Sequence, residues 1–201
     1  MKDSHQFIIG RNLNKEFKIN RSIFIGSISK AVSAKEAEVV IEKTRKKYFD
    51  ATHNCFAYRI DENQFRFYDD GEPYGTAGRP ILSRLEKHSL IQTVLIVTRF
   101  FGGKKLGRGG LKRAYSQTAE ETITMAGTKR VIFYDTISVI CPYNFVGKFH
   151  RLTKKYYGVI TNLYDNMEAT ISVRVPKKLS KEFMGELSNL GAGKIRIMDF
   201  K

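Results

Sequence analysis

The sequence predicts an α+β protein of two domains, residues 1–130 and residues 131–201. The chain has 201 residues, 42% hydrophobic and 27% charged, which is an ordinary globular composition for one domain or two small ones. Stretches of alternating apolar residues, typical of strands, are interspersed with stretches of helical period. The pattern changes near residue 130, in the segment TKRVIFY. We therefore expect each part to have a core of its own.

The first domain begins with a strand region and then a helix. Ser33 and Glu36 have the spacing of a capping box, and apolar residues follow at helical intervals as far as Tyr48. An aromatic strand, ATHNCFAYRI, is expected over residues 51–60. After a polar turn, QFRFYDD alternates again, which predicts a hairpin.

Three further elements complete the first domain. A helix is expected to start near Thr76 and to carry Ile81, Leu82 and Leu85 on its apolar face. The segment IQTVLIVTRFF is apolar and β-branched, which is typical of a central strand buried on both faces. A glycine-rich segment then opens a last helix that runs to about Gly127.

The second domain has a shorter series of elements. The apolar pattern predicts strands over 137–141, 159–164, 169–175 and 194–200, with helices over 145–156 and 179–190, the first of them ended by Gly158. The resulting β-α-β-β-α-β order is that of a ferredoxin-like domain, in which two helices cover one antiparallel sheet.

The net charge is the unusual property of the composition. Lys and Arg number 35 against 20 Asp and Glu, a formal charge of +15. Such a surplus favours polyanionic partners, either nucleic acid or an anionic membrane. No apolar run approaches the roughly 20 residues of a spanning helix, the N-terminus lacks signal-peptide features, and two cysteines argue against a disulfide scaffold. We expect a cytoplasmic protein with no membrane partner.

The glycine-rich segment RFFGGKKLGRGGLKRAY carries the strongest local signal. Six cations occur between Arg99 and Arg113, and no acid occurs between Glu86 and Glu120. Lys112 and Arg113 are expected in the first helical turn, where cations oppose the helix dipole, which indicates an external anion such as phosphate. The segment is not a Walker loop. The alternative is a glycine hairpin whose cations face water. The predicted nucleic-acid or phosphate-binding residues are Arg99, Gly102, Gly103, Lys104, Lys105, Gly107, Arg108, Gly109, Gly110, Lys112 and Arg113.

The acidic loop DDGEPYGTAGRP carries the second signal. Asp69, Asp70 and Glu72 could hold a hard cation, act as acid and base, or pair with the basic segment. The backbone at the following helix start could equally receive an anion. The alternative is a β-turn with Thr76 as N-cap. Because the two loops have opposite charge, we expect one of the three carboxylates within about 8 Å, one Debye length, of Arg99 or residues 102–110.

His53 and Cys55 are expected on the same side of their strand. Zinc would need about two more soft ligands, and the remaining His and Cys residues are too scattered, so no metal site is predicted. A Cys–His nucleophilic pair is conceivable, but a core or hydrogen-bonding role is favoured.

Several aromatic residues near these loops could stack on nucleic-acid bases, although aromatic residues in strands are more often core residues. The candidates are Phe65, Phe67, Tyr68, Phe100 and Phe101.

Three sequence blocks together resemble the YigZ/IMPACT family: ATHNCFAYRI, DDGEPYGTAGRPIL and VTRFFGGKKLGRGGLKRAY. They occur in the same order as in that family and at similar spacing. The blocks cover about residues 51–115, and the C-terminal 65 or so residues resemble the small second domain of bacterial members. The resemblance implies a first domain like domain four of elongation factor G, with a ribosomal-protein-like fold, and a second like domain five. It also implies a cleft formed by the motif residues His53, Asn54, Asp69, Asp70, Gly71, Glu72, Gly75, Thr76, Gly78 and Arg79.

The leading functional hypothesis is a cytoplasmic nucleic-acid- or ribosome-binding protein, more a translation-related regulator than an enzyme, without cofactor or metal. RNA or the ribosome is the expected partner, and a protein partner in translation control is possible. One alternative is an enzyme on a phosphorylated or peptide substrate that uses the Asp69, Asp70 and Glu72 loop with His53. Another is a regulator whose pocket holds the acidic tail of a partner protein.

Overall fold

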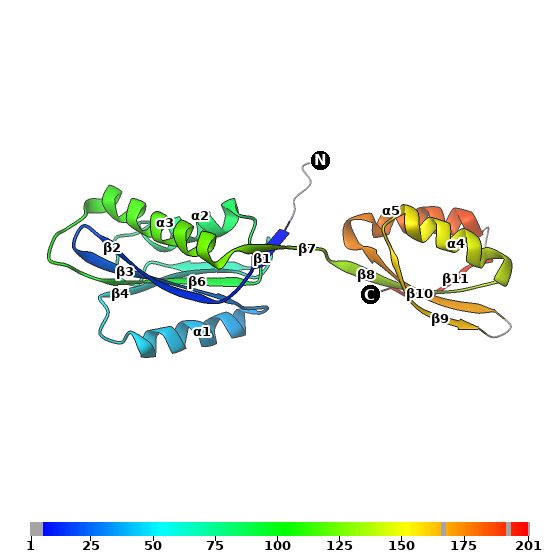
Figure 1. The fold of residues 1–201 in the computed structure, drawn as a ribbon, viewed down its shortest axis with the longest axis horizontal. Coiled ribbons are helices and arrows are strands. Elements are labelled where there is room, and N and C mark those ends of the chain that lie inside the picture. The colour runs from blue at the N-terminus through cyan, green and yellow to red at the C-terminus, as the bar shows by residue number, and fades with distance from the viewer. Residues whose placement is uncertain (1–5, 166–167, 192–193, 201) are drawn as a thin grey trace. The chain divides into compact units, whose positions relative to one another are not determined.

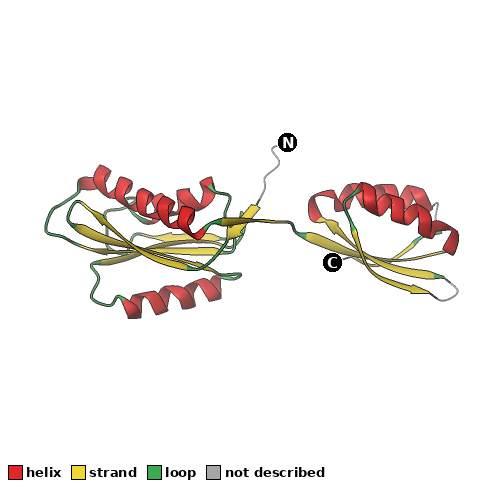
Figure 2. Ribbon diagram, viewed as in Figure 1, coloured by secondary structure: helices red, strands yellow, loops and turns green. Residues whose placement is uncertain are grey.

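The computed structural model describes residues 6–165, 168–191 and 194–200. The chain divides into two compact units, Met1–Val131 and Ile132–Lys201, and each unit has an antiparallel sheet of its own (Figures 1 and 2). The α+β class predicted from the sequence is confirmed. In the described part of the chain, no helix is long and apolar enough to cross a membrane.

The first unit is built on a five-stranded sheet with the order β2-β3-β6-β4-β5, while β1 pairs with β7 separately. The elements are β1 (Gln6–Ile9), β2 (Leu13–Ile19), β3 (Ser22–Lys30), α1 (Ala34–Lys47), β4 (His53–Arg59), β5 (Phe65–Tyr68), α2 (Gly78–Lys87), β6 (Thr93–Phe100), α3 (Gly107–Ala126) and β7 (Thr128–Val131).

Helices cover both faces of this sheet: α1 lies on one face, and α2 and α3 lie on the other (Figure 1). The central strand β6 supplies both cores. Its Val94 and Ile96 belong to the cluster under α1, while Leu95 and Val97 belong to the larger cluster under α2 and α3. The predicted central strand, buried on both faces, is therefore confirmed.

The ends of the helices follow local sequence signals. The Ser33 hydroxyl accepts a hydrogen bond from the Glu36 amide at 3.2 Å, and the Glu36 carboxylate accepts one from the amide of Val32. This is the predicted capping box with one difference. The Glu36 carboxylate bonds to the amide of Val32, one residue before the N-cap, instead of to the amide of Ser33. At the other end of the unit, α3 stops at Gly127, which has a φ of 70°.

The helix α3 packs unusually close to strand β3. A Cβ atom built on Gly26 would lie 1.9 Å from the Thr122 hydroxyl oxygen. Only glycine leaves room for the helix at this point. The contact sets how near the C-terminal half of α3, which contains Thr122, lies to the sheet.

The second unit has the predicted β-α-β-β-α-β order, with strands arranged β11-β8-β10-β9 and both helices on one face (Figure 1). Its elements are β8 (Tyr134–Cys141), α4 (Tyr143–Lys155), β9 (Val159–Asp165), β10 (Ala169–Pro176), α5 (Lys177–Gly191) and β11 (Arg196–Phe200). The prediction for the end of α4 is corrected, because the left-handed residue is Tyr157, with a φ of 54°, rather than Gly158. Gly158 instead permits close packing, since its Cβ would lie 2.9 Å from Thr153.

Candidate nucleic-acid interface

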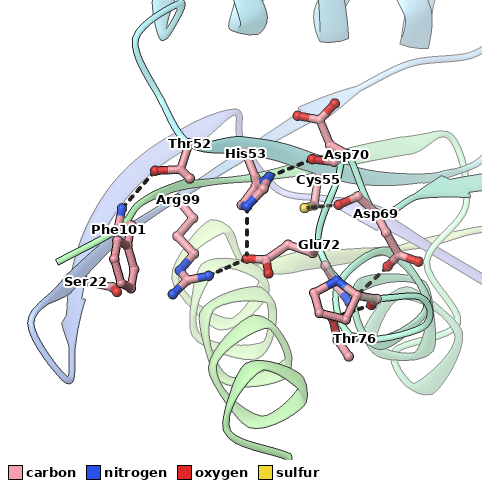
Figure 3. Close-up of polar contacts among 12 residues, drawn as sticks. Ser22, Thr52, His53, Cys55, Asp69, Asp70, Glu72, Thr76, Arg99 and Phe101 are labelled. Atoms are coloured by element: carbon pink, nitrogen blue, oxygen red, sulfur yellow. Dashed lines mark hydrogen bonds and ion pairs between the residues drawn. The ribbon is translucent and has the colours of Figure 1, made fainter. Parts of the chain in front are cut away.

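The acidic loop and the end of β6 meet at a buried ion pair. Arg99 Nη1 donates to Glu72 Oε1 at 2.6 Å, and the two residues are 5% and 7% exposed (Figure 3). The Tyr115 hydroxyl, from α3, donates to the same carboxylate oxygen at 2.8 Å. The predicted juxtaposition of acidic loop and Arg99 is confirmed. Because the pair is buried and neutral, it links the two loops rigidly instead of offering a charge to a ligand.

Arg99 thus departs from its predicted role as a phosphate contact. Its guanidinium carbon lies 5.6 Å from the ring centre of Phe24 and 5.5 Å from that of Phe101. Such cation–π contacts stabilise a guanidinium away from water. The sequence shows a cation beside a basic loop but does not show that its side chain points inward, so the residue belongs to the framework of the site.

The carboxylate of Asp69 caps helix α2. Its two oxygens accept hydrogen bonds from the amides of Gly75, Ala77 and Gly78, at 2.8, 3.0 and 2.8 Å. The alternative with Thr76 as N-cap is therefore corrected, because the Thr76 hydroxyl donates to the Pro73 carbonyl. The anion expected at this helix start is supplied by the protein itself, eight to nine residues upstream.

Asp70 and His53 join the loop to strand β4. Asp70 has a φ of 46°, and its carboxylate accepts from the Asn54 amide at 2.6 Å and from Arg45 at 3.3 Å. The Asp70 carbonyl lies 2.7 Å from His53 Nδ1. Since a carbonyl can only accept, Nδ1 carries the proton, and Nε2 faces Glu72 at 4.0 Å (Figure 3). All three carboxylates of the loop therefore have partners within the fold.

Cys55 lies beneath the same loop as a buried hydrogen-bonding residue. Its thiol contacts the Asp69 carbonyl at 2.9 Å and the Tyr115 hydroxyl at 3.4 Å. Burial raises the pKa of this thiol well above its ordinary value, so the thiolate required of a nucleophile is disfavoured. The geometry supports the core role rather than the Cys–His pair.

Two residues predicted in the cleft point elsewhere. The side chain of Asn54 leaves the opposite face of β4, where it accepts from Thr98 and donates to the Tyr48 carbonyl. Arg79 is exposed on α2 and pairs with Glu86 at 3.3 Å. The glycines of the loop serve its backbone: a Cβ on Gly78 would lie 2.7 Å from the backbone of Tyr68, and Gly71 and Gly75 have positive φ.

The glycine-rich segment makes a sharp connection from β6 to α3. A Cβ on Gly102 would lie 1.7 Å from the Arg21 carbonyl oxygen, so β6 must leave the sheet on a glycine. Gly103 and Gly107 then have φ values of 81° and 69°. The helix begins at Gly107, which corrects the placement of Lys112 and Arg113 in the first turn; Arg108 is the cation of that turn.

The lysines and arginines of this segment between residues 104 and 113 are exposed. Lys104, Lys105, Lys112 and Arg113 have no acidic partner among the residues described. Arg108 donates to the carbonyl of Tyr74, in the acidic loop, at 3.0 Å. This contact, which the sequence did not indicate, is a second link between the loops. Within the part of the chain described, no three His, Cys, Asp or Glu side chains gather as a metal site would require.

Comparison with known proteins places this site in a family. The sequence model of the Impact N-terminal domain matches residues 20–123, a range that contains every residue of the site. The chain belongs to the IMPACT family. The IMPACT family member YvyE of Bacillus subtilis (strain 168) is 34% identical over 186 residues, covering 92% of this chain and 86% of that protein. The IMPACT family member YigZ of Escherichia coli (strain K12) is 28% identical, covering 90% of this chain and 91% of that protein.

Other members match a smaller part of the chain. Protein IMPACT of Bos taurus is 35% identical over 92 residues, which is 43% of this chain and 29% of that protein.

A solved structure matches nearly the whole chain. It is described as that of a hypothetical protein, superimposes with a TM-score of 0.65 at 26% identity and covers 98% of both chains. The chain is therefore of the two-domain bacterial type within the IMPACT family.

Proposed function

We propose that this IMPACT family member is a translation-related protein that binds RNA or the ribosome. The exposed cations of residues 104–113 would contact the phosphates, and the second unit would add binding surface. We also propose, from the resemblance of the sequence, that the two units correspond to domains four and five of elongation factor G, which would be consistent with a ribosomal or RNA partner.

A contrast between two helix starts carries the proposal. Helix α2 has its N-terminus closed by the Asp69 carboxylate. Helix α3 has Leu106 as N-cap with no capping side chain among the described residues, and three of its first four residues are glycine. Exposed amides and a positive dipole end attract phosphate. At the start of α2, the positive end of the helix dipole meets an internal carboxylate. At the start of α3, it lies beside exposed cations and has no such carboxylate among the described residues.

The enzyme alternative has less support from the geometry. Asp69 caps a helix, Asp70 holds β4, and Glu72 is shared by Arg99 and Tyr115. A general acid or base needs a carboxyl free to exchange its proton with substrate. We therefore infer that the acidic loop is the support that positions the basic segment.

The salt dependence of RNA binding tests the proposal. For single strands, log K should fall with log salt by about 0.7 per phosphate neutralised. Replacing Lys104, Lys105 and Arg108 by Ala should flatten this slope by about 2 units and should weaken the affinity for all RNA sequences alike. The charge-matched control replaces Lys35, Lys43 and Lys46, which are exposed on α1 across the sheet (Figure 1).

The control variant should keep the slope of the wild type. An equal loss of slope in both variants would show that only the overall charge matters and would overturn the assignment to the basic segment. If the wild type binds neither RNA nor ribosomes at about 50 mM salt, where phosphate contacts are strong, the proposal itself is wrong.

A further inference from the structure

We propose that Tyr74 and Phe101 form a stacking platform for unpaired bases, so that the ligand of the basic segment is single-stranded nucleic acid. The inference rests on the proposed function and adds the ligand class to it. The two aromatic residues come from the acidic loop and from the end of β6, which the Glu72–Arg99 pair and the Arg108 contact hold together.

Tyr74 is a large aromatic residue that is 85% exposed on a rigid turn. The Thr76 amide and hydroxyl both donate to the Pro73 carbonyl, at 3.0 and 2.6 Å. The amide of Gly75, the residue after Tyr74, donates to the Asp69 carboxylate. Because the backbone of this turn is already fixed, a ligand that covers the ring has to order only the two side-chain torsions of Tyr74.

Phe101 is the second ring, 46% exposed and fixed on both sides along the chain. Its amide donates to the Thr52 hydroxyl at 2.9 Å, and the following Gly102 is confined against Arg21. The Arg99 guanidinium lies against the ring at 5.5 Å (Figure 3). The part of the ring that remains exposed can stack on a base.

The cations and the rings complement the two parts of a nucleotide. Arg108 connects them, because its guanidinium belongs to the basic segment and donates to the Tyr74 carbonyl at 3.0 Å. Phosphates would lie against the cations while the bases turn onto the rings, the combination found in proteins that bind single strands. A duplex keeps its bases stacked inside and can use only the cations.

Affinity measurements test the platform in the full chain. Replacing Tyr74 or Phe101 by Leu should weaken binding of a labelled single-stranded RNA by about 5- to 150-fold each, because a base–aromatic stack is worth about 1–3 kcal/mol. Binding of the duplex formed with the complementary strand should not change. The salt slope should also stay at its wild-type value, since stacking releases no counterions.

Phe65 provides a matched control. It is 45% exposed, like Phe101, but it pairs with Arg59 at the far end of β4, whereas His53 at the near end pairs with Arg99. Phe65→Leu should bind both RNAs as the wild type does. If it weakens single-strand binding as much as Phe101→Leu, the effect is not specific to the platform.

A spectroscopic signature makes the test independent of affinity. The chain contains no tryptophan, so Tyr74→Trp introduces a single one. This variant should retain the wild-type affinity and should lose much of its tryptophan fluorescence when single-stranded RNA is added, whereas Phe65→Trp should not. Absence of quenching in the Tyr74→Trp complex would contradict stacking at this ring.

The outcomes separate the two proposals. If the wild type binds neither RNA nor ribosomes, the proposed function is wrong and the platform with it. If it binds ribosomes but no free single-stranded RNA, the platform alone is wrong. If the wild type binds single strands and both Leu variants bind them equally well, only the platform is wrong. If the Leu variants bind single strands and duplex with equally weakened affinity, the platform is also wrong, because a duplex has no unpaired bases that could stack on the rings.

Discussion

Cys55 shows how a residue that looks reactive in the sequence is inactivated by its surroundings. The residue is fully buried, its thiol points to a backbone carbonyl, and nearby carboxylates add to the effect of burial in raising its pKa. Burial also raises the pKa of Cys141, in the second unit. Both side chains belong to the cores of their units.

We expect neither thiol to react in the native protein. Ellman's reagent at mildly alkaline pH should release almost no chromophore until denaturant is added, because labelling requires an exposed thiolate. Cys141→Ala and Cys55→Ala variants assign the signal to each unit. Rapid stoichiometric labelling of Cys55 in the native state would contradict its burial and would restore the nucleophile hypothesis.

At the scale of elements, the start of α2 depends on one carboxylate. Asp69→Ala removes the partner of three amides, and we expect it to destabilise the protein by about 2 kcal/mol or more, the sum of a lost cap and of unsatisfied buried groups. A small anion should bind in the gap. Formate should therefore raise the urea midpoint of Asp69→Ala more than that of the wild type, relative to chloride at equal ionic strength.

Asp69→Asn is the control for this experiment, because its amide oxygen still accepts hydrogen bonds and its volume blocks the added anion. It should be less destabilised than the Ala variant and insensitive to formate. A formate effect of equal size in all three proteins would mean that the anion acts elsewhere, and the assignment of Asp69 as the cap of α2 would then be wrong.

The elements of the fold could largely be predicted from the sequence, because their signals are local. The capping box before α1 and the glycine after α3 each involve residues within four positions of one another. Contacts across the chain could not be predicted. Asp69 caps a helix from a preceding turn, and Arg99 turns away from the basic loop to meet Glu72, since the burial of a side chain depends on neighbours distant in sequence.

Across the whole molecule, the two compact units have separate cores, with the division between Val131 and Ile132. We predict that a fragment of residues 1–131 folds alone. It should unfold cooperatively on heating and retain near-UV dichroism, because its sheet, its three helices and the β1–β7 pair are complete. A fragment with helical far-UV but no near-UV signal would be a molten globule and would contradict independent folding.

The contact between Gly26 and Thr122 has a consequence for how sequences of this family can diverge. No side chain fits at position 26 while a threonine stands at 122 and α3 keeps its place. An ancestor that acquired alanine at position 26 could survive only with a smaller residue at 122 or with the C-terminal half of the helix lifted from the sheet. Substitutions at these two buried positions should therefore be coupled in the evolution of the family, although they lie almost a hundred residues apart in the sequence.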